Sequence, residues 1–316
     1  LISNINSGLI PVMEEGLCEL INENSTRQKF THELKSLANC DVVYISADVP
    51  TDHAGASDLT GIKLLIKDVI SVLSPDSVLV ILCQVPPGFT RSIDFCLERV
   101  FYQVETLVFG TALERALNPE RFIVGSLKPE KQLCSPLNSI LKTFYAPILN
   151  MRYESAELAK IAINMCLVSS ISVANTLAEI CEGIGADWNE IVPALKLDRR
   201  IGKNSYLKPG LGIAGGNLER DISTVISLSE EYDTDACVVR AWRKNNLHRK
   251  EWAVRIFNSL KTKLGVGDIV AVWGLAYKEN THSIKNSPAI FTIMQLENTK
   301  INIHDPVVSD DVIQFL

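Results

Sequence analysis

The sequence lacks the patterns that would place it in several common protein classes. Its eight cysteines form no Cys-x-x-Cys pair and show no zinc-ligand spacing, so neither a disulfide-rich secreted domain nor a zinc site is expected. No apolar run approaches the ~18 residues that a membrane-spanning helix needs, and the first residues show no signal-peptide pattern. No internal repeat or low-complexity segment occurs. These absences predict a soluble, cytoplasmic protein with buried, reduced thiols.

The chain also has too little basic charge for a nucleic-acid partner. Its formal net charge is −6 and its isoelectric point is about 5.5, and no basic stripe stands out. The richest basic cluster, residues 240–250, is interpreted as the solvated face of a helix. With 316 residues, 47% of them hydrophobic and 22% charged, the chain is long enough for two or more domains with a well-filled core. We expect no nucleic-acid and no membrane partner.

The first half of the sequence alternates between strand and helix patterns. Short apolar runs predict strands, and apolar residues at helical spacing predict helices between them. The expected strands are 41–46, 77–82 and 122–125, and the expected helices are 58–72 and 91–99. This alternation predicts a doubly wound parallel sheet with crossover helices.

A long uninterrupted helix pattern follows at 156–183, well above the usual ~11–12 residues. Further helices are expected at 187–195, 218–231, 237–260 and 288–296, with strands at 269–274 and 300–304. The predicted fold class is α/β, with two Rossmann-like doubly wound parallel-sheet domains joined by a long central helix and a helical middle domain. The predicted boundaries are 1–150 for a cofactor-binding domain, 151–262 for a central helical domain, and 263–316 for a second Rossmann-like domain.

The most unusual segment of the chain is a glycine-rich stretch from Leu207 to Asp221. Four glycines stand at positions 210, 212, 215 and 216, and the stretch closes with Arg220 and Asp221. Glycine gives up conformational entropy but lets the backbone come close to another group. We therefore expect this stretch to bring backbone N–H groups close to a ligand.

Together with Lys160 and Asn164, this stretch resembles the substrate loop of the UDP-glucose/GDP-mannose dehydrogenase family, the nucleotide-sugar 6-dehydrogenases. Other segments are similar to that family's motifs and follow in the family's order. They are Asn6–Pro11, Glu14–Leu17, Val49–Thr51, Val85–Gly88, Asn118–Arg121, Ala156–Lys160, Arg199–Gly202, Gly274–Lys278, Ser287–Ala289 and Asp305–Pro306. The chain is identified as a divergent member of this family.

The resemblance implies an NAD-dependent oxidoreductase of polysaccharide biosynthesis that oxidises the C6 alcohol of a nucleotide sugar to a carboxylate with two NAD⁺. It also implies a homodimer formed through the 156–183 helix, and no metal. In the family the second oxidation proceeds through a thiohemiacetal on a cysteine. Ungapped alignment of the loop places that cysteine at Asn217, whose amide nitrogen is essentially non-basic and cannot act as the nucleophile.

The remaining catalytic roles follow from the same resemblance. Lys160 would stabilise the oxyanion that develops at C6, and Asn164 would add a hydrogen bond. Asp221 would act in proton transfer, and Glu105 would manage the hydrolytic water. Two further residues of the family's catalytic set are replaced in this sequence. The lysine that accompanies the aspartate is Arg220, and the second acid of the glutamate motif is Phe109. An arginine keeps the charge but does not release a proton near neutral pH.

The binding residues are better preserved than the oxidation machinery. The resemblance assigns the nucleotide sugar to a set of cationic and glycine residues, Arg200, Lys208, Gly212, Gly215, Gly216 and Lys278. It assigns NAD to two strand ends, Pro50 and Thr51 after one strand and Gln84 and Pro86 after the next. The family's Gly-x-Gly-x-x-Gly turn does not stand before the first expected strand, and we expect the natural protein to extend beyond both ends of this sequence.

Three hypotheses remain open from the sequence. The first is a nucleotide-sugar dehydrogenase whose four-electron oxidation is altered or impaired. The second is an enzyme that stops after a two-electron oxidation to the aldehyde, which needs a base and a cofactor but no thiol. The third is a non-catalytic nucleotide-sugar-binding homologue, or a partner subunit of an active relative.

Overall fold

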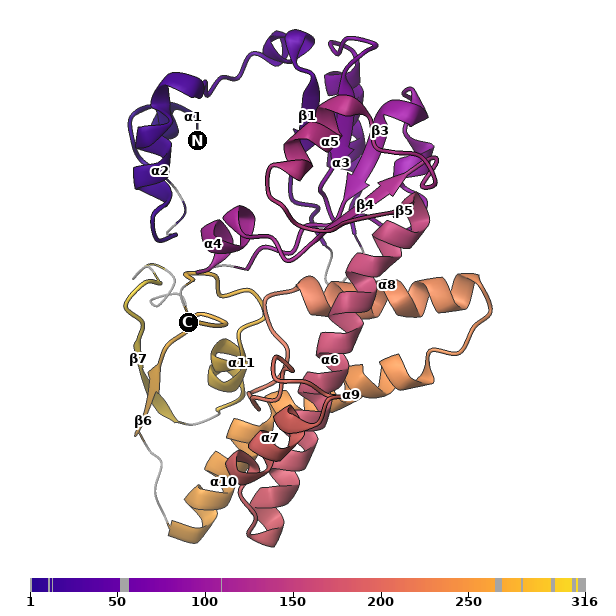
Figure 1. Ribbon diagram of the computed structural model, residues 1–316. Coiled ribbons are helices and arrows are strands. Elements are labelled where there is room, and N and C mark those ends of the chain that lie inside the picture. The colour runs from indigo at the N-terminus through magenta and orange to yellow at the C-terminus, as the bar shows by residue number, and fades with distance from the viewer. Residues whose placement is uncertain are drawn as a thin grey trace. The chain divides into compact units, whose positions relative to one another are not determined.

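The computed structural model describes residues 2–10, 12, 14–51, 57–108, 110–264, 269–279, 281–296, 299–308 and 311. Phe109 and Pro11, which the sequence comparison invoked, lie outside the described residues. The described part of the chain forms two compact units, one up to residue 162 and one from residue 163 onward. The division falls within helix α6 (Tyr153–Ile184), so its first residues belong to the first unit and the rest to the second. Figure 1 shows α6 as one continuous helix.

The first unit is built around a five-stranded sheet. Its strands are β1 (Val42–Ile45), β2 (Val78–Ile81), β3 (Val100–Gln103), β4 (Phe122–Ser126) and β5 (Ile148–Arg152). Its helices before α6 are α1 (Ile2–Asn6), α2 (Leu17–Glu23), α3 (Thr60–Ile70), α4 (Ala112–Leu117) and α5 (Ser135–Lys142), with 3₁₀ turns η1 (Ser25–Arg27), η2 (Leu34–Asn39), η3 (Thr90–Ser92) and η4 (Leu97–Arg99).

The strands lie in the order β1-β2-β3-β4-β5, with β1–β2, β2–β3 and β4–β5 parallel. The pair β3–β4 is antiparallel, which the sequence did not predict. Strand β4 is buried along almost its whole length, and such a near-continuous apolar run reads the same in either direction. The α/β class with a largely parallel sheet is confirmed.

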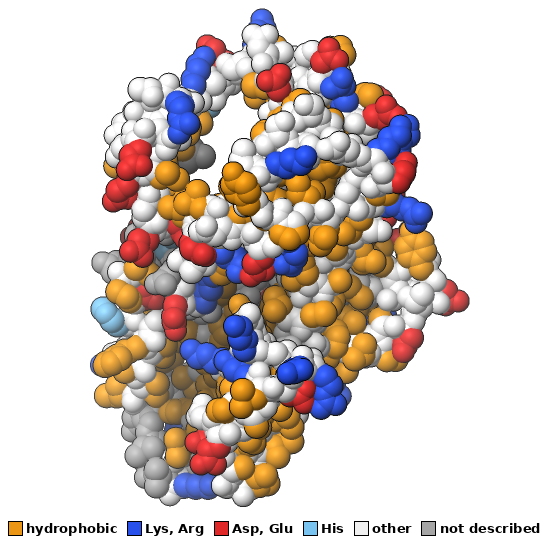
Figure 2. Space-filling model, in the orientation of Figure 1, with side chains coloured by type: hydrophobic (Ala, Val, Ile, Leu, Met, Phe, Trp, Pro, Cys, Tyr) orange, Lys and Arg blue, Asp and Glu red, His pale blue; other side chains and the backbone are white. Residues whose placement is uncertain are grey.

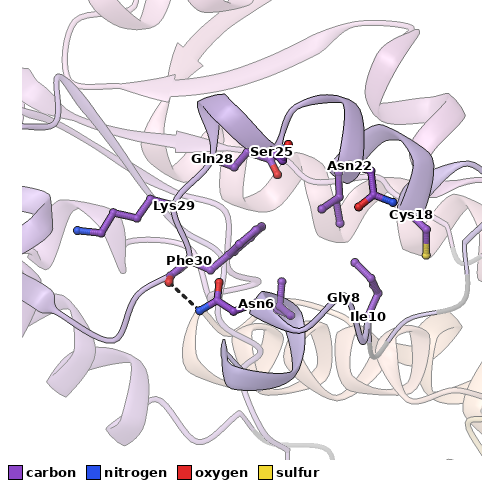
Figure 3. Close-up of a pocket in the computed structure, with 11 residues that line it drawn as sticks. Asn6, Gly8, Ile10, Cys18, Asn22, Ser25, Gln28, Lys29 and Phe30 are labelled. Atoms are coloured by element: carbon purple, nitrogen blue, oxygen red, sulfur yellow. Dashed lines mark hydrogen bonds between the residues drawn. The ribbon is translucent and has the colours of Figure 1, made fainter.

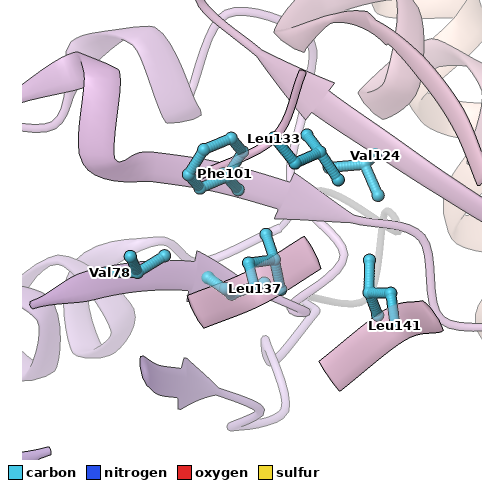
Figure 4. Close-up of a cluster of buried hydrophobic side chains, with 7 residues drawn as sticks. Val78, Phe101, Val124, Leu133, Leu137 and Leu141 are labelled. Atoms are coloured by element: carbon cyan, nitrogen blue, oxygen red, sulfur yellow. The ribbon is translucent and has the colours of Figure 1, made fainter. Parts of the chain in front are cut away.

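One face of this sheet is covered by α5. Figure 4 shows Leu137 and Leu141 of α5 with Val78, Phe101 and Val124 of the strands. Leu137 is 0% exposed and Leu141 is 1% exposed, because α5 repeats apolar residues at positions i and i+4, which places them on one helix face. This cluster holds β2, β3 and β4 in place, and the loops that follow these strands are positioned by it.

The second unit is mostly helical. It contains the rest of α6, then α7 (Trp188–Leu197), α8 (Asn217–Glu231), α9 (Cys237–Lys250), α10 (Trp252–Leu264), β6 (Ile269–Trp273), α11 (Pro288–Gln295) and β7 (Lys300–His304). Helices α8 and α9 lie side by side (Figure 1) and share a buried apolar cluster with α6 that includes Val168, Ile222 and Val239. Strands β6 and β7 are parallel, and α11 packs against them.

Two helix predictions were wrong. Within residues 91–99 the chain forms the 3₁₀ turns η3 and η4, and residues 93–96 between them are not helical, so no continuous helix is present. Residues 237–260 form two helices, α9 and α10, separated at Glu251. The predicted long helix at 156–183 is confirmed as α6.

Within the described part of the chain, α6 is the one helix long and apolar enough to cross a membrane, judged only by length and composition. A core helix of a globular protein passes the same test. Several α6 residues, among them Val168, Ala174 and Cys181, are buried in the apolar clusters of the second unit. Part of α6 therefore contributes to the hydrophobic core of that unit.

Asp305 ties the loop after β7 to the loop after β6. Its carboxylate accepts backbone N–H bonds from Leu275 (2.6 Å), Ala276 (3.2 Å), Val307 (2.8 Å) and Val308 (2.8 Å). Burial alone would raise the pKa of Asp305, but the four N–H bonds hold the charged form and lower the pKa to about 2. The charged carboxylate is therefore part of the folded state of this region.

We expect Asp305→Asn to destabilise the second unit by about 1–3 kcal/mol near neutral pH, because an amide cannot serve all four donors. The difference in unfolding free energy between wild type and variant should have its largest value above the ordinary pKa of 3.8. It should decrease as the pH falls toward the folded-state pKa of about 2. Chemical unfolding at a series of pH values measures it. Glu279→Gln, at a side chain that is 91% exposed, is the control and should have little effect. A difference that grows as the pH falls would contradict the prediction.

Candidate functional site

Asn164 and Asp221 form a buried pair in the second unit. The Nδ2 of Asn164, on α6, donates to Oδ2 of Asp221, in the second turn of α8, at 2.5 Å. Asn164 is 6% exposed and Asp221 is 1% exposed, so the hydrogen bond holds the carboxylate in one orientation away from bulk water. Lys160 stands one helical turn before Asn164 on α6 and is half-buried.

Asn217, at the position that aligns with the family's nucleophile, begins α8 and is exposed. Its side-chain oxygen accepts a hydrogen bond from Nη2 of Arg220 at 3.1 Å. The guanidinium belongs to a residue that is only 6% exposed. The amide and the guanidinium thus contact each other, and neither group supplies a nucleophile or exchanges a proton near neutral pH.

The glycine stretch is held from one side by polar side chains of α6 and α9. Asn175 accepts from the amide of Gly210 (2.8 Å), and Asn246 accepts from the amide of Ile213 (2.6 Å). Arg249 donates through Nε to the carbonyl of Gly210 at 2.7 Å. Buried side chains therefore satisfy the backbone of a loop that has no regular hydrogen-bonding partner.

The interpretation of residues 240–250 as a solvated face holds for Arg240, Arg243, Lys244 and His248, which are exposed, and is wrong only at the end of the helix. Asn246, Arg249 and Lys250 are 6%, 6% and 8% exposed. They sit in the last turns of α9, where the helix lies against the glycine stretch. The sequence around the end of α9 does not show whether its polar side chains are solvated or buried, because the groups that these side chains contact are distant in the sequence.

The glycine stretch also lies close to Tyr277 and Lys285. The amide of Gly215 donates to the carbonyl of Lys285 at 3.0 Å. A Cβ added to Gly215 would lie 2.7 Å from Cε2 of Tyr277, and the φ of Gly215 is +85°. Only glycine combines this backbone conformation with this close approach. Gly216, with φ of 97°, then caps the N-terminus of α8.

The structure does not bring every predicted binding residue into this region. The Arg200 side chain is 88% exposed and forms a two-point pair with its own neighbour Asp198 (2.6 and 3.0 Å). The Lys208 side chain is 91% exposed, with Nζ 4.0 Å from Glu279. Lys278 is half-buried, with its ammonium 5.8 Å from the ring centroid of Tyr277. Arg200 and Lys208 are therefore not pre-positioned by buried contacts.

Glu105 follows β3 in the first unit. Its carboxylate accepts hydrogen bonds from the backbone N–H groups of Thr106 (2.6 Å) and Leu107 (2.8 Å). The carboxylate is therefore hydrogen-bonded to the loop in which it lies. It lines a cavity of about 360 Å³ together with residues of β1, β3, α4 and α5. No observation in this unit gives Glu105 a water-activating role, which stays a prediction from the resemblance.

The proposed cofactor residues stand at one edge of the first sheet. Pro50 and Thr51 follow β1, and Gln84 and Pro86 follow β2, which pairs with β1 in parallel. Parallel neighbours end at the same edge, where dinucleotides bind in open α/β sheets. The residues therefore fit part of such a cofactor. The spacing Gly-x-Gly-x-x-Gly does occur, at 210–215, but it precedes α8 without a strand before it, so it is not the pyrophosphate turn.

Glu157 is a buried residue whose position the sequence gave no reason to single out. It is 0% exposed, and its carboxylate accepts the amides of Gly88 (2.6 Å) and Thr90 (2.8 Å). Burial raises the pKa of Glu157, and the hydrogen bonds oppose that rise. It anchors the turn after β2 to the first turns of α6. The available signal was its place inside the segment Ala156–Lys160, which is similar to a motif of the family.

The other cavities do not add a chemical site. One of about 400 Å³ lies among α1, α2 and η1 of the first unit and is lined by Asn6, Cys18, Asn22, Lys29, Phe30 and others (Figure 3). It contains none of the predicted site residues. Within the described ranges, no group of three or more His, Cys, Asp or Glu could hold a metal ion.

The first unit has a sheet edge of the kind at which dinucleotides bind in α/β proteins, and the second unit has a glycine loop that precedes the helix carrying the buried Asp221. The sequence matches three parts of the UDP-glucose/GDP-mannose dehydrogenase family: the NAD binding domain over residues 1–149, the central domain over 154–248 and the UDP binding domain over 271–316. The chain belongs to this family, and NAD is the cofactor that the family's NAD binding domain indicates.

Individual proteins similar to this chain are named as UDP-glucose dehydrogenases. The chain is 30% identical to a UDP-glucose 6-dehydrogenase of Rickettsia typhi, over 97% of this chain and 73% of that protein. It is 28% identical to UDP-glucose 6-dehydrogenase TuaD of Bacillus subtilis, over 97% and 68%. A solved UDP-glucose dehydrogenase of Pyrobaculum islandicum superposes with a TM-score of 0.86 at 26% identity, over 97% of this chain and 74% of that one.

Proposed function

We propose that this protein binds a UDP-glucose-type nucleotide sugar and NAD but is impaired in the four-electron oxidation to the carboxylate. The observation that carries this proposal is the Asn217–Arg220 contact at the start of α8, at 3.1 Å. It occupies the position that aligns with the family's nucleophilic cysteine and with its lysine. Measuring NADH and carboxylate formed from NAD⁺ and UDP-glucose tests the proposal.

Other cysteines near the pair are poor substitutes. Cys166 follows Asn164 by two residues on α6 and so points to a different side of the helix. Cys237 begins α9, and the hydrogen bond from its thiol to Asp235 raises its pKa, which is the opposite of what activates a thiol. Neither supports a thiohemiacetal at the sugar.

The residues that survive suit binding and the first oxidation. We assign to Lys160 the stabilisation of the C6 oxygen, and to Asp221, oriented by Asn164, the acceptance of a proton directly or through water. Gly212, Gly215 and Gly216 present backbone groups to the sugar nucleotide, with Arg200, Lys208 and Lys278 supplying cationic side chains. The strand-end residues Pro50, Thr51, Gln84 and Pro86 would hold the cofactor, which when bound accepts hydride. We assign to Glu105, on the resemblance alone, the management of the hydrolytic water.

We further propose a cytoplasmic protein of polysaccharide biosynthesis, organised as domains 1–150, 151–262 and 263–316. On the face shown in Figure 2, Lys and Arg side chains are interspersed with Asp and Glu. That mixture supports a small-molecule substrate over a polyanion.

We propose a homodimer formed through α6. Val173, Leu177, Ile180 and Ile184 are 49%, 41%, 49% and 73% exposed, and their spacings of four, three and four residues place them in one stripe. A second copy of the same helix would cover it. We expect sedimentation to give a dimer for the wild type and a monomer for Ile180→Glu, since a charge in an apolar interface is costly. Leu197→Glu, at an 84% exposed position outside the stripe, should stay dimeric. A wild-type monomer would contradict the proposal.

A further inference from the structure

Glu219, in the first turn of α8, contacts two elements that the glycine stretch also touches. Its Oε1 accepts from Nζ of Lys250, at the end of α9, at 2.6 Å. Its Oε2 accepts from Nδ2 of Asn286. The side chains of Lys250 and Glu219 are 9% and 26% exposed, so the ion pair is largely shielded from water. One carboxylate thus joins three segments of the second unit.

Both partners of Glu219 are adjacent to glycines of the loop. The Cγ of Lys250 lies 3.0 Å from where a Cβ on Gly212 would stand, so the lysine stem lies on the loop while its ammonium reaches Glu219. Asn286 follows Lys285, whose carbonyl accepts the amide of Gly215. Asn286 itself has a φ of +54°, in the left-handed region that asparagine adopts more readily than most residues.

From this geometry we infer that Glu219 is a positioning residue for the glycine stretch. By holding Asn286 it keeps the Lys285 carbonyl in place for Gly215, and by holding Lys250 it keeps the lysine stem over Gly212. The inference rests on the proposed function in one respect, that the stretch binds a nucleotide sugar. A carboxylate suits this role because Lys250 and Asn286 donate to its two different oxygens, whereas in a glutamine one of the two positions is an NH₂ group that cannot accept a hydrogen bond.

The test compares the wild type with Glu219→Gln and Asn286→Leu, using Glu231→Gln as the matched control on an exposed glutamate at the other end of α8. Amide hydrogen exchange is followed at Gly215 and at Ile213. We expect Gly215 to exchange about tenfold faster in Glu219→Gln. Ile213, which is held by Asn246, should change much less. Asn286→Leu should reproduce the effect, and the double variant should add little to it.

The affinity for UDP-glucose, measured by calorimetry on the same proteins, should fall about tenfold in Glu219→Gln and stay unchanged in Glu231→Gln. Unchanged exchange at Gly215 in Glu219→Gln would overturn the inference, whatever happens to affinity. Faster exchange with unchanged affinity would overturn it as well, because the loop would then move without consequence for the ligand. If the wild type binds no UDP-glucose while Gly215 exchange rises, the proposed function fails and the structural role of Glu219 stands.

Discussion

Incubated with NAD⁺ and UDP-glucose, the wild-type protein is expected to form carboxylate product at a rate on the order of 10⁴-fold or more below that of an enzyme with an intact nucleophile. The second hydride can leave only from a tetrahedral adduct at C6, and Asn217 cannot form one. Its side-chain oxygen is bonded to Arg220 at 3.1 Å. Counting NADH against sugar consumed, with separate detection of aldehyde and carboxylate, measures the effect.

The variant that restores the family's pair provides the converse test. We expect Asn217→Cys with Arg220→Lys to form carboxylate faster than the wild type, because a thiolate near a lysine can add to the aldehyde. Asn217→Ala with Arg220→Lys is the control, since it makes the same change at 220 without a nucleophile, and it should stay inactive.

Each outcome with the wild type selects one of the hypotheses. Two NADH per sugar would contradict the proposed impairment. One NADH per sugar with free aldehyde would identify a two-electron dehydrogenase. No NADH together with measurable UDP-glucose binding would identify a nucleotide-sugar-binding homologue or partner subunit.

The second large effect is expected for Gly215→Ala. The new Cβ would lie 2.7 and 2.9 Å from Cε2 and Cζ of Tyr277, at a φ of +85°. The positive φ alone costs on the order of 1–3 kcal/mol, and the contact forces the loop away from residue 277. Because a misplacement of about 1 Å can cost on the order of 100-fold in a site, we expect the affinity for UDP-glucose to fall by about that factor in calorimetry.

Gly210→Ala is the matched control for this substitution. Nothing lies within 4 Å of a Cβ added at Gly210, and its φ is not positive. It should bind UDP-glucose as the wild type does, with both of its backbone hydrogen bonds kept. Combining Gly215→Ala with Tyr277→Ala should recover part of the affinity by removing the contact but not the backbone strain. Equal affinities for Gly215→Ala and Gly210→Ala would contradict the prediction that the close contact between Gly215 and Tyr277 matters for binding.

Many of the helices and strands were predictable because they depend on patterns of neighbouring residues. The apolar periodicity of α6 and the short apolar runs of β1 and β2 are properties of neighbouring residues. Where a pattern was ambiguous, the prediction failed, as at residues 91–99, where two short 3₁₀ turns stand in place of the expected helix. The direction of β4 was not predicted either, because the residues of a strand do not specify whether it pairs parallel or antiparallel with its neighbour, and the antiparallel pairing with β3 is a property of the tertiary structure.

The sequence by itself determined the family, the α/β class, the long central helix and the residue identity at position 217. These follow from residue types in a fixed order along the chain. Only the tertiary structure decided which side chains hold the glycine stretch: Asn175, Asn246 and Arg249 reach it from 33 to 39 residues away, and Glu219 joins Lys250 and Asn286. The physical reason is that burial and pairing depend on what packs against a side chain, and that neighbour is set by the fold.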